Sequence, residues 1–192
     1  MKYPAALWLI TAAWVAACPV YAQDVPNRAP NAGFEEPAGV EDVMPAVWSF
    51  FSSRINGIAV TSETARNGKQ CVRMRAQNVP TAFQGLITEL PVTGGEKYTF
   101  SVYVINSKVT PLKGSAELGL VVEWRDSQNR EVARVASATL DTTISKIRWT
   151  QLALSGITAP ENATRAVFGI HLHDGARGAE GTVLLDDVVI AP

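Results

Sequence analysis

Apolar and polar residues alternate one by one in several short runs along this chain. The clearest runs span residues 100–104, 118–125, 168–173 and 183–190. A period of two is typical of a β-strand with one buried face, because successive side chains point to opposite sides of a sheet. In the last run, two apolar pairs bracket Asp186-Asp187. The pattern predicts short strands that cover a common core.

Residues that favour turns separate these runs. They cluster at residues 67–68, 93–95, 127–129, 159–162 and 175–181. No segment of about 11 residues carries the apolar stripe of period 3.6 that a surface helix needs. About nine or ten short antiparallel strands joined by turns are typical of an all-β sandwich. We find no internal repeat, so we expect one such domain.

The first residues have the features of a secretory signal peptide. Lys2 precedes a mostly apolar run from Ala5 to Ala17 that ends in small residues. The run is shorter than the roughly 20 apolar residues that span a bilayer. We therefore expect this segment to direct export and then to be removed.

Two cleavage sites fit this segment, and both imply export. In Val20-Tyr21-Ala22, small residues stand where signal peptidase requires them and polar residues follow, which favours a mature chain from Gln23. The sequence Val15-Ala16-Ala17-Cys18 instead resembles a bacterial lipobox. We expect a secreted or periplasmic protein, and the alternative is an outer-membrane lipoprotein with its lipid anchor at Cys18.

The chain accordingly divides into three parts. Residues 1–22 are the predicted signal peptide, residues 23–32 a leader with two prolines, and residues 33–192 the β-sandwich domain. Cleavage after Ala22 leaves Cys71 as the one cysteine, so no disulfide can form within the mature chain. Cys71 lies in a strand-like segment, and we expect it to be a small buried residue rather than a nucleophile.

Composition excludes several classes of function. The 192 residues include 17 Lys and Arg against 18 Asp and Glu, for a net charge of −1, and contain no basic run. This argues against a nucleic-acid partner. Two His and two Cys do not suffice for a zinc ribbon, and the chain has no glycine-rich phosphate loop. Nucleotide-dependent enzymes and metal-cluster proteins are therefore not expected.

Several segments carry known motifs in a fixed order. Asn31-Ala32-Gly33-Phe34-Glu35, followed by Pro45 and Trp48, has the form N-x-G-F-E … P-x-x-W. Further matches cover residues 64–74, 98–104, 149–152, 159–160 and 184–188. Together these segments resemble carbohydrate-binding modules of the cellulose- and xylan-binding type. The resemblance spans residues 31–191 and implies the galactose-binding-like jelly roll as the fold, more than it implies a ligand.

This resemblance also implies a structural Ca²⁺ at one edge of the sandwich. The residues that match the family's calcium ligands are Gly33, Glu35, Lys69 and Asp186. Ca²⁺ takes about six to eight oxygen ligands, which carboxylates and backbone carbonyls supply. The alternative is that Glu35 and Asp186 accept hydrogen bonds from turn amides and no ion binds.

A carbohydrate ligand needs side chains on an outward sheet face. The three tryptophans of the mature chain are expected in the core, because they match buried family positions or alternate in phase with apolar residues. The polar side of the strands offers six candidates for ligand binding: Arg73, Arg75, Tyr103, Glu123, His171 and His173. If their strands share a sheet, these side chains share a face and contact sugar hydroxyls or an acidic sugar.

We expect a non-catalytic protein that binds a poly- or oligosaccharide. The alternative is a structural or adhesive module of the cell envelope with a protein partner. Two catalytic hypotheses have less support. A metal at His171 and His173 needs a third ligand, for which Glu123 or Asp174 would have to serve. A glycosidase needs two carboxylates across a cleft, and the polar side of the strands offers Glu123 alone.

Overall fold

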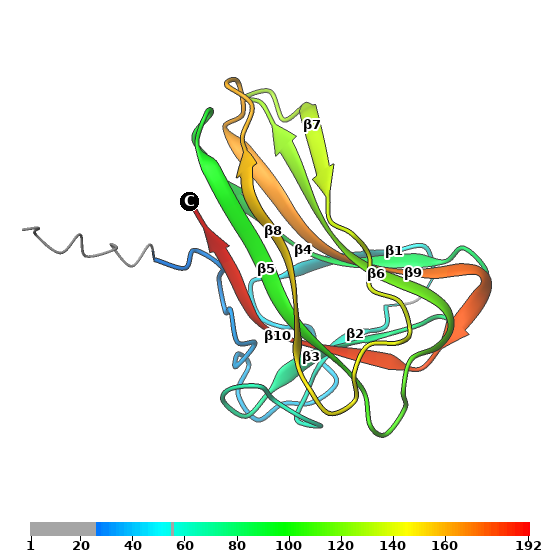
Figure 1. Cartoon of the computed structure of the whole chain (residues 1–192). Helices are drawn as coiled ribbons and strands as arrows, with labels where there is room; N and C mark the ends of the chain where they lie inside the picture. Colours follow the sequence, from blue (N-terminus) through cyan, green and yellow to red (C-terminus); the bar gives the residue numbers. More distant parts are fainter. Residues whose placement is uncertain (1–25, 55) are drawn as a thin grey trace, which may run out of the picture.

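The computed structural model describes residues 26–54 and 56–192, which form two five-stranded sheets packed face to face (Figure 1). Sheet A has the strand order β1 (Ser49–Ser52), β4 (Phe83–Pro91), β9 (Arg165–Glu180), β6 (Lys113–Arg125) and β7 (Glu131–Ala136). Sheet B has the order β2 (Ile58–Thr61), β3 (Cys71–Arg75), β10 (Thr182–Ala191), β5 (Lys97–Asn106) and β8 (Thr150–Thr158).

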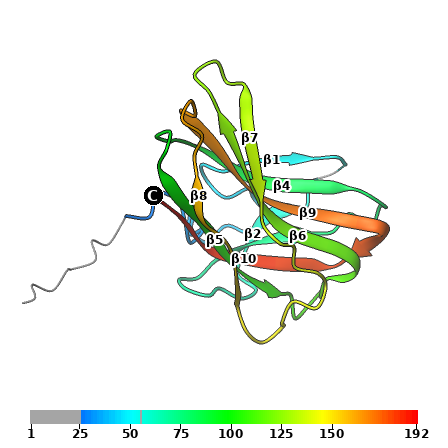
Figure 2. The same ribbon diagram turned by 45° about the horizontal axis from the view of Figure 1, so that its top comes forward.

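Neighbouring strands within each sheet pair antiparallel. Figure 2 shows the same two layers from another side, with β7 at a free edge of sheet A. The described residues contain ten strands and no helix. The all-β sandwich predicted from the alternation of apolar and polar residues is therefore confirmed.

The apolar side of each strand faces the interior between the two sheets. Ring pairs join the layers, since Phe100 on sheet B lies 5.4 Å from Phe168 on sheet A and Tyr98 lies 5.7 Å from Trp124. Such tilted or edge-on ring contacts add to the gain from burying apolar area. Trp48 and Trp124 are buried as expected, and Trp149 is half-buried.

The chain passes from sheet A to sheet B between β9 and β10, at the orange-to-red bend in Figure 1, which we call the β9–β10 corner. The sequence predicted a turn over residues 175–181, but β9 continues to Glu180 and Gly181 alone separates the two strands. Position 175 has room only for a glycine, because β6 passes close by and a Cβ would clash with Ser115. These glycines mark close strand packing rather than a loop.

An irregularity in β10 explains the apolar pairs around Asp186-Asp187. The pairing of β10 with β5 shifts register between Asp186 and Val189, and Asp187 has a φ of 48°. A bulge of this kind changes the side to which later residues point. Leu185 and Val188 are consequently both fully buried, although an unbroken strand would direct them to opposite sides.

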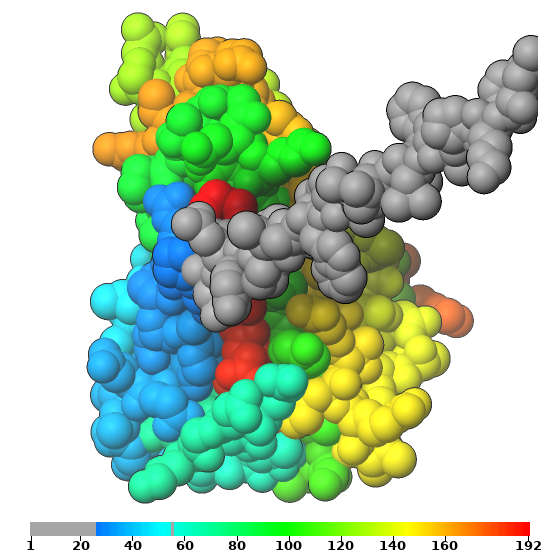
Figure 3. All heavy atoms as spheres, turned by 60° about the vertical axis from the view of Figure 1, so that its left-hand side comes forward, coloured from blue at the N-terminus to red at the C-terminus, as the bar shows by residue number. Residues whose placement is uncertain are grey.

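The described part of the expected leader is attached to the domain. Asn27 exchanges hydrogen bonds with Val188 and Ile190, and the amide of Arg28 donates to the carbonyl of Ile190 at 2.7 Å. Figure 3 shows this blue segment next to the red C-terminal strand. Residues 27 and 28 of the expected leader therefore pack against β10.

The expected signal peptide and the Cys18 anchor lie outside the described residues. Among the residues that the structure does describe, no helix is long and apolar enough to cross a membrane.

Cys71 is fully buried, as expected for a small apolar residue. It lies on the outer side of sheet B in a small cluster with Ile105 and Leu184, against which Trp149 packs. Burial raises the pKa of the Cys71 thiol to about 12. The thiol is therefore neutral and unreactive at ordinary pH.

Candidate functional site

The six residues expected on one binding face lie on two opposite faces. Sheet A carries Glu123, His171 and His173, and sheet B carries Arg73, Arg75 and Tyr103. The whole sandwich separates the two groups, so the expectation of a shared face was wrong. It assumed that the strands belong to one sheet, and local alternation does not encode which distant strands pair.

A groove of about 300 Å³ crosses the outer face of sheet A. The lining residues that matter below are Phe51, Glu89, Glu123, Arg125, Gly169 and His171. They come from the four strands β1, β4, β6 and β9. We call this feature the sheet A groove.

Glycines on the central strands create the space for the rings in this groove. Phe51 lies over Gly85 and His171 lies over Gly169, so closely that a Cβ on either glycine would clash with the ring. The two rings meet edge to face, with centroids 4.9 Å apart. The glycines thus let the rings lie across the sheet.

Charged side chains occupy the other end of the sheet A groove. Glu123 accepts from Arg125 at 2.9 Å and from Arg134 at 2.8 Å. On the neighbouring strands, Arg165 pairs with Glu89 at 2.9 Å. The Nε of Arg125 is buried and has no hydrogen-bond partner among the described residues.

His171 is neutral at ordinary pH. Burial, with a smaller contribution from neighbouring His173, lowers the pKa of His171 to about 4. A neutral imidazole has one N–H donor and one acceptor nitrogen. Beyond it, exposed His173 stacks with exposed Phe83 at 5.9 Å, which extends the aromatic strip along the sheet.

Sequence reasoning missed Phe51, Phe83, Glu89 and Arg125. The strand β4 alternates weakly, because the buried side includes Gln84 and Thr88 while the outward side includes apolar residues. The side-chain amide of Gln84 can be buried because its oxygen and nitrogen hydrogen-bond to the backbone of Gly57 and Arg75. The outward-facing glycines of the central strands, Gly85 in β4 and Gly169 in β9, were the signal that could have revealed the face.

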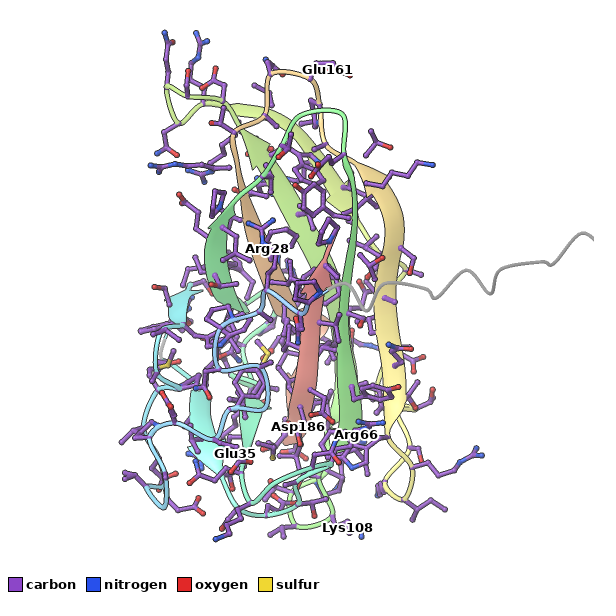
Figure 4. All side chains as sticks on the ribbon, turned by 90° about the vertical axis from the view of Figure 1, so that its left-hand side faces the viewer. Arg28, Glu35, Arg66, Lys108, Glu161 and Asp186 are labelled. Carbon is purple, nitrogen blue, oxygen red and sulfur yellow. The ribbon has the colours of Figure 1, made fainter. Side chains whose placement is uncertain are left out.

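Tyr103 does not present a free ring to a ligand. The Arg66 guanidinium lies over it, 3.6 Å from the ring centroid, and also pairs with Asp187. Figure 4 shows Arg66 and Asp186 together at one end of the sandwich, opposite Glu161. Tyr103 therefore supports the turn at residues 66–70 rather than a sugar.

The residues expected to bind calcium gather at this same end. Oε1 of Glu35 accepts the amides of Lys69 and Gln70 at 2.9 and 3.0 Å. Oδ2 of Asp186 accepts the amide of Arg66 at 2.7 Å. Both carboxylates therefore hold the turn at residues 66–70, as the alternative without calcium requires.

The same spot has features that fit a cation. Asp186 is fully buried and pairs with no cationic side chain of the described residues, and burial raises its pKa to about 6. A Cβ on Gly33 would lie 3.9 Å from oxygens of both Asp186 and Asp187, so oxygen atoms converge here. Because the described residues hold no cluster of three His, Cys, Asp or Glu side chains, carbonyls would supply most ligands of a Ca²⁺. Calcium stays a prediction.

The absence of such a cluster in the described part also leaves the His171–His173 metal hypothesis without support. The two rings instead contact Phe51 and Phe83.

No protein-family model and no curated protein sequence matches this chain. Solved structures do match. One is TmCBM61 in complex with β-1,4-galactotriose, at 15% identity and a TM-score of 0.57, over 86% of this chain and 97% of that one. Another is the CBM22-1 xylan-binding domain of Paenibacillus barcinonensis Xyn10C, at 20% identity and a TM-score of 0.56, over 83% and 90%.

Similar folds also occur within longer chains. The enzymatically active domain of bacteriophage CBA120 tailspike protein 4 matches at 15% identity and a TM-score of 0.58, over 86% of this chain but 21% of that one. The ten-stranded sandwich and these matches agree with the sequence resemblance. The chain therefore shares the β-sandwich jelly-roll fold of these carbohydrate-binding modules.

Proposed function

We propose that this protein is a non-catalytic module that binds a poly- or oligosaccharide in the sheet A groove. The observation that carries the proposal is the meeting of two rings, Phe51 and His171, with a charged cluster around Glu123. A sugar ring presents C–H groups to aromatic faces and hydroxyls to polar groups. Few other ligand classes need both within one groove.

The polar groups are placed to recognise hydroxyls. Arg125 and Arg134 hold Glu123 from two sides, which fixes its carboxylate without a change of rotamer on binding. The carboxylate of Glu123 is then a fixed acceptor for a ligand hydroxyl.

The ion pairs favour binding over hydrolysis. Glu89 and Glu123 both line the sheet A groove, so the second carboxylate that a glycosidase needs is present after all. However, each accepts a hydrogen bond from an arginine. Each carboxylate is therefore held in an ion pair, which suits a fixed acceptor for ligand hydroxyls better than a group that must move a proton to a leaving group.

The ligands named for similar structures give the first compounds to test. These are β-1,4-galactotriose and xylan. We also propose export by the predicted signal peptide. An envelope module with a protein partner remains the second candidate, and it would need neither ring of the sheet A groove.

The test is affinity electrophoresis of residues 23–192 in gels with xylan, β-1,4-galactan or other neutral glycans. We expect one class to retard the protein, and Phe51→Ala to weaken this binding about tenfold. Phe50→Ala is the matched control, because Phe50 is 45% exposed and points to the other side of the same strand. It should bind as the wild type does. Retardation by no glycan, or equal loss in both variants, would contradict the proposal.

A further inference from the structure

A second, larger cavity lies on the other side of the molecule. It has a volume of about 760 Å³ and opens between the outward side of β2 and β3 and the segment that leads into β6. Two of the arginines expected to bind a ligand, Arg73 and Arg75, line it. We call it the basic cavity. The proposed function uses neither the cavity nor these arginines.

Residues 109–111 and the β9–β10 corner form one wall of the basic cavity, and hydrogen bonds hold them together. The amide of Thr182 donates to the carbonyl of Thr110 at 2.8 Å, and their hydroxyls lie 3.1 Å apart. Gly181, with a φ of +94°, lies so close to the Pro111 carbonyl that a Cβ would clash with it. The cavity is therefore preformed, which lowers the entropy cost of binding.

Three cations and two carboxylates line the basic cavity: Arg73, Arg75, Lys113, Asp42 and Glu180. Arg73 pairs with Asp42. In the part of the chain that the structure describes, the guanidinium of Arg75 and the ammonium of Lys113 have no hydrogen-bond or ion-pair partner. Two cations thus remain unpaired against the single carboxylate of Glu180.

The chemistry of this lining differs from that of the sheet A groove. None of the described residues that line the basic cavity is aromatic. Without a ring to stack on, a neutral sugar gains little there. An anionic group gains more, because a guanidinium forms paired, charge-assisted hydrogen bonds with the planar oxygens of a carboxylate or with two oxygens of a sulfate.

We propose that the basic cavity binds the anionic substituent of an acidic saccharide, with Arg75 and Lys113 as its main ligands. The choice of a saccharide rests on the proposed function, whereas the choice of an anion rests on the unpaired cations. The volume lies within the range of about 300–1,000 Å³ of small-molecule pockets. A carboxylate of a uronic acid and a sulfate ester both offer this chemistry.

The experiment measures binding of residues 23–192 to galacturonate oligomers, to a sulfated oligosaccharide and to the neutral glycan of the previous test. Calorimetry at low and high salt gives the affinities. We expect one of the two acidic ligands to bind, more weakly as salt rises. Arg75→Gln and Lys113→Gln should each weaken this binding about tenfold, because each removes a charged hydrogen bond.

Lys97→Gln is the matched control. Lys97 is exposed at the far end of β5 and loses the same charge, so it should bind acidic ligands as the wild type does. Melting temperatures show whether each variant is folded. Arg75→Lys separates the loss of charge from a change in packing. It keeps the positive charge without the guanidinium geometry, so it should bind acidic ligands more tightly than Arg75→Gln and more weakly than the wild type.

The outcomes separate this inference from the proposed function. If neutral glycans bind and no acidic one does, or if acidic binding survives the Arg75→Gln/Lys113→Gln double variant, the basic cavity is not the site. If Phe51→Ala abolishes acidic binding and the double variant does not, the acidic sugar lies in the sheet A groove. If acidic glycans bind through Arg75 and neutral ones do not bind, the inference holds and the proposed groove fails.

Discussion

His171 couples the stability of the protein to pH. Its pKa of about 4 in the folded protein lies below the value of about 6.5 of an unperturbed histidine, because burial disfavours the imidazolium. The folded state therefore binds the proton less well than the unfolded state. The stabilising contribution is complete above about pH 6.5 and is lost as pH falls toward 4.

We expect this residue to cost the wild type up to about 3 kcal/mol of unfolding free energy between pH 7 and pH 4. Between pH 7 and pH 4, the unfolding free energy of His171→Phe should therefore fall by about 3 kcal/mol less than that of the wild type. Urea unfolding at the two pH values measures the difference. His173→Phe, on the same face of β9 but exposed, is the control and should keep the wild-type pH dependence. An unchanged slope in His171→Phe would contradict the assignment.

Tyr103 has a structural role that its position in the sequence did not reveal. It is a platform for Arg66, which in turn pairs with Asp187. Tyr103→Ala should lower the unfolding free energy by about 1–2 kcal/mol and leave glycan retention unchanged. Tyr103→Phe keeps the ring and should stay near the wild type. Weaker glycan binding by a folded Tyr103→Ala would place the sugar on sheet B instead.

Among the elements, the turn at residues 66–70 is the place where Ca²⁺ binding can be tested. Glu35 and Asp186 accept its amides, and the buried Asp186 carboxylate has no cationic partner within residues 26–54 and 56–192. If Ca²⁺ binds there, excess chelator should lower the melting temperature and added Ca²⁺ should raise it, because an ion bound only to the folded state stabilises that state.

Asp186→Asn should abolish this response, since it keeps the shape but removes the charge. Glu117→Gln, at an exposed position on sheet A, should respond as the wild type does. A melting temperature that chelator leaves unchanged would mean that hydrogen bonds alone hold the turn.

The β9–β10 corner depends on a glycine for two separable reasons. Gly181 has a positive φ, and the Pro111 carbonyl leaves no room for a Cβ. Gly156 also has a positive φ, of 64°, but nothing lies within 4 Å of its Cβ position. Gly156→Ala should therefore cost only about 1 kcal/mol, the price of backbone strain.

Gly181→Ala should cost more, about 2–4 kcal/mol, since the wall of the basic cavity must move. Thermal unfolding of the two variants measures the difference. Equal losses of unfolding free energy in the two variants would show that the Pro111 carbonyl moves away at little cost.

At the scale of elements, the sequence predicted the strands better than it predicted which strands pair with each other. Alternation predicted which side of β5, β6 and β9 is buried, because that signal is local. It misjudged residues 175–181, where small residues serve close packing rather than a turn. It could not assign β9 and β10 to different sheets, because sheet membership depends on hydrogen bonds between strands distant in sequence.

For the whole molecule, the two sheets present surfaces with different chemistry. Sheet A offers rings and fixed ion pairs, and the basic cavity beside sheet B offers unpaired cations. The residues expected from sequence were divided between them, which is why six plausible candidates did not form one site. Outward side chains can be identified strand by strand, but a site requires knowledge of which strands lie side by side.

The separation of the two sites yields a prediction about the whole molecule. Packed sheets lie about 10 Å apart, and both sites are on outward surfaces, so no ligand group can occupy both. A saturating neutral glycan should therefore change the affinity for an acidic saccharide by less than about twofold. In the double variant, Phe51→Ala should weaken only the binding of the neutral glycan and Arg75→Gln only that of the acidic saccharide, each by as much as in the single variant, since distant sites act independently. Calorimetric titration of the glycan-loaded protein measures this. Competition between the two ligands would instead mean that both bind at one site. That site is the sheet A groove if Phe51→Ala abolishes the binding of both ligands, and the basic cavity if Arg75→Gln does.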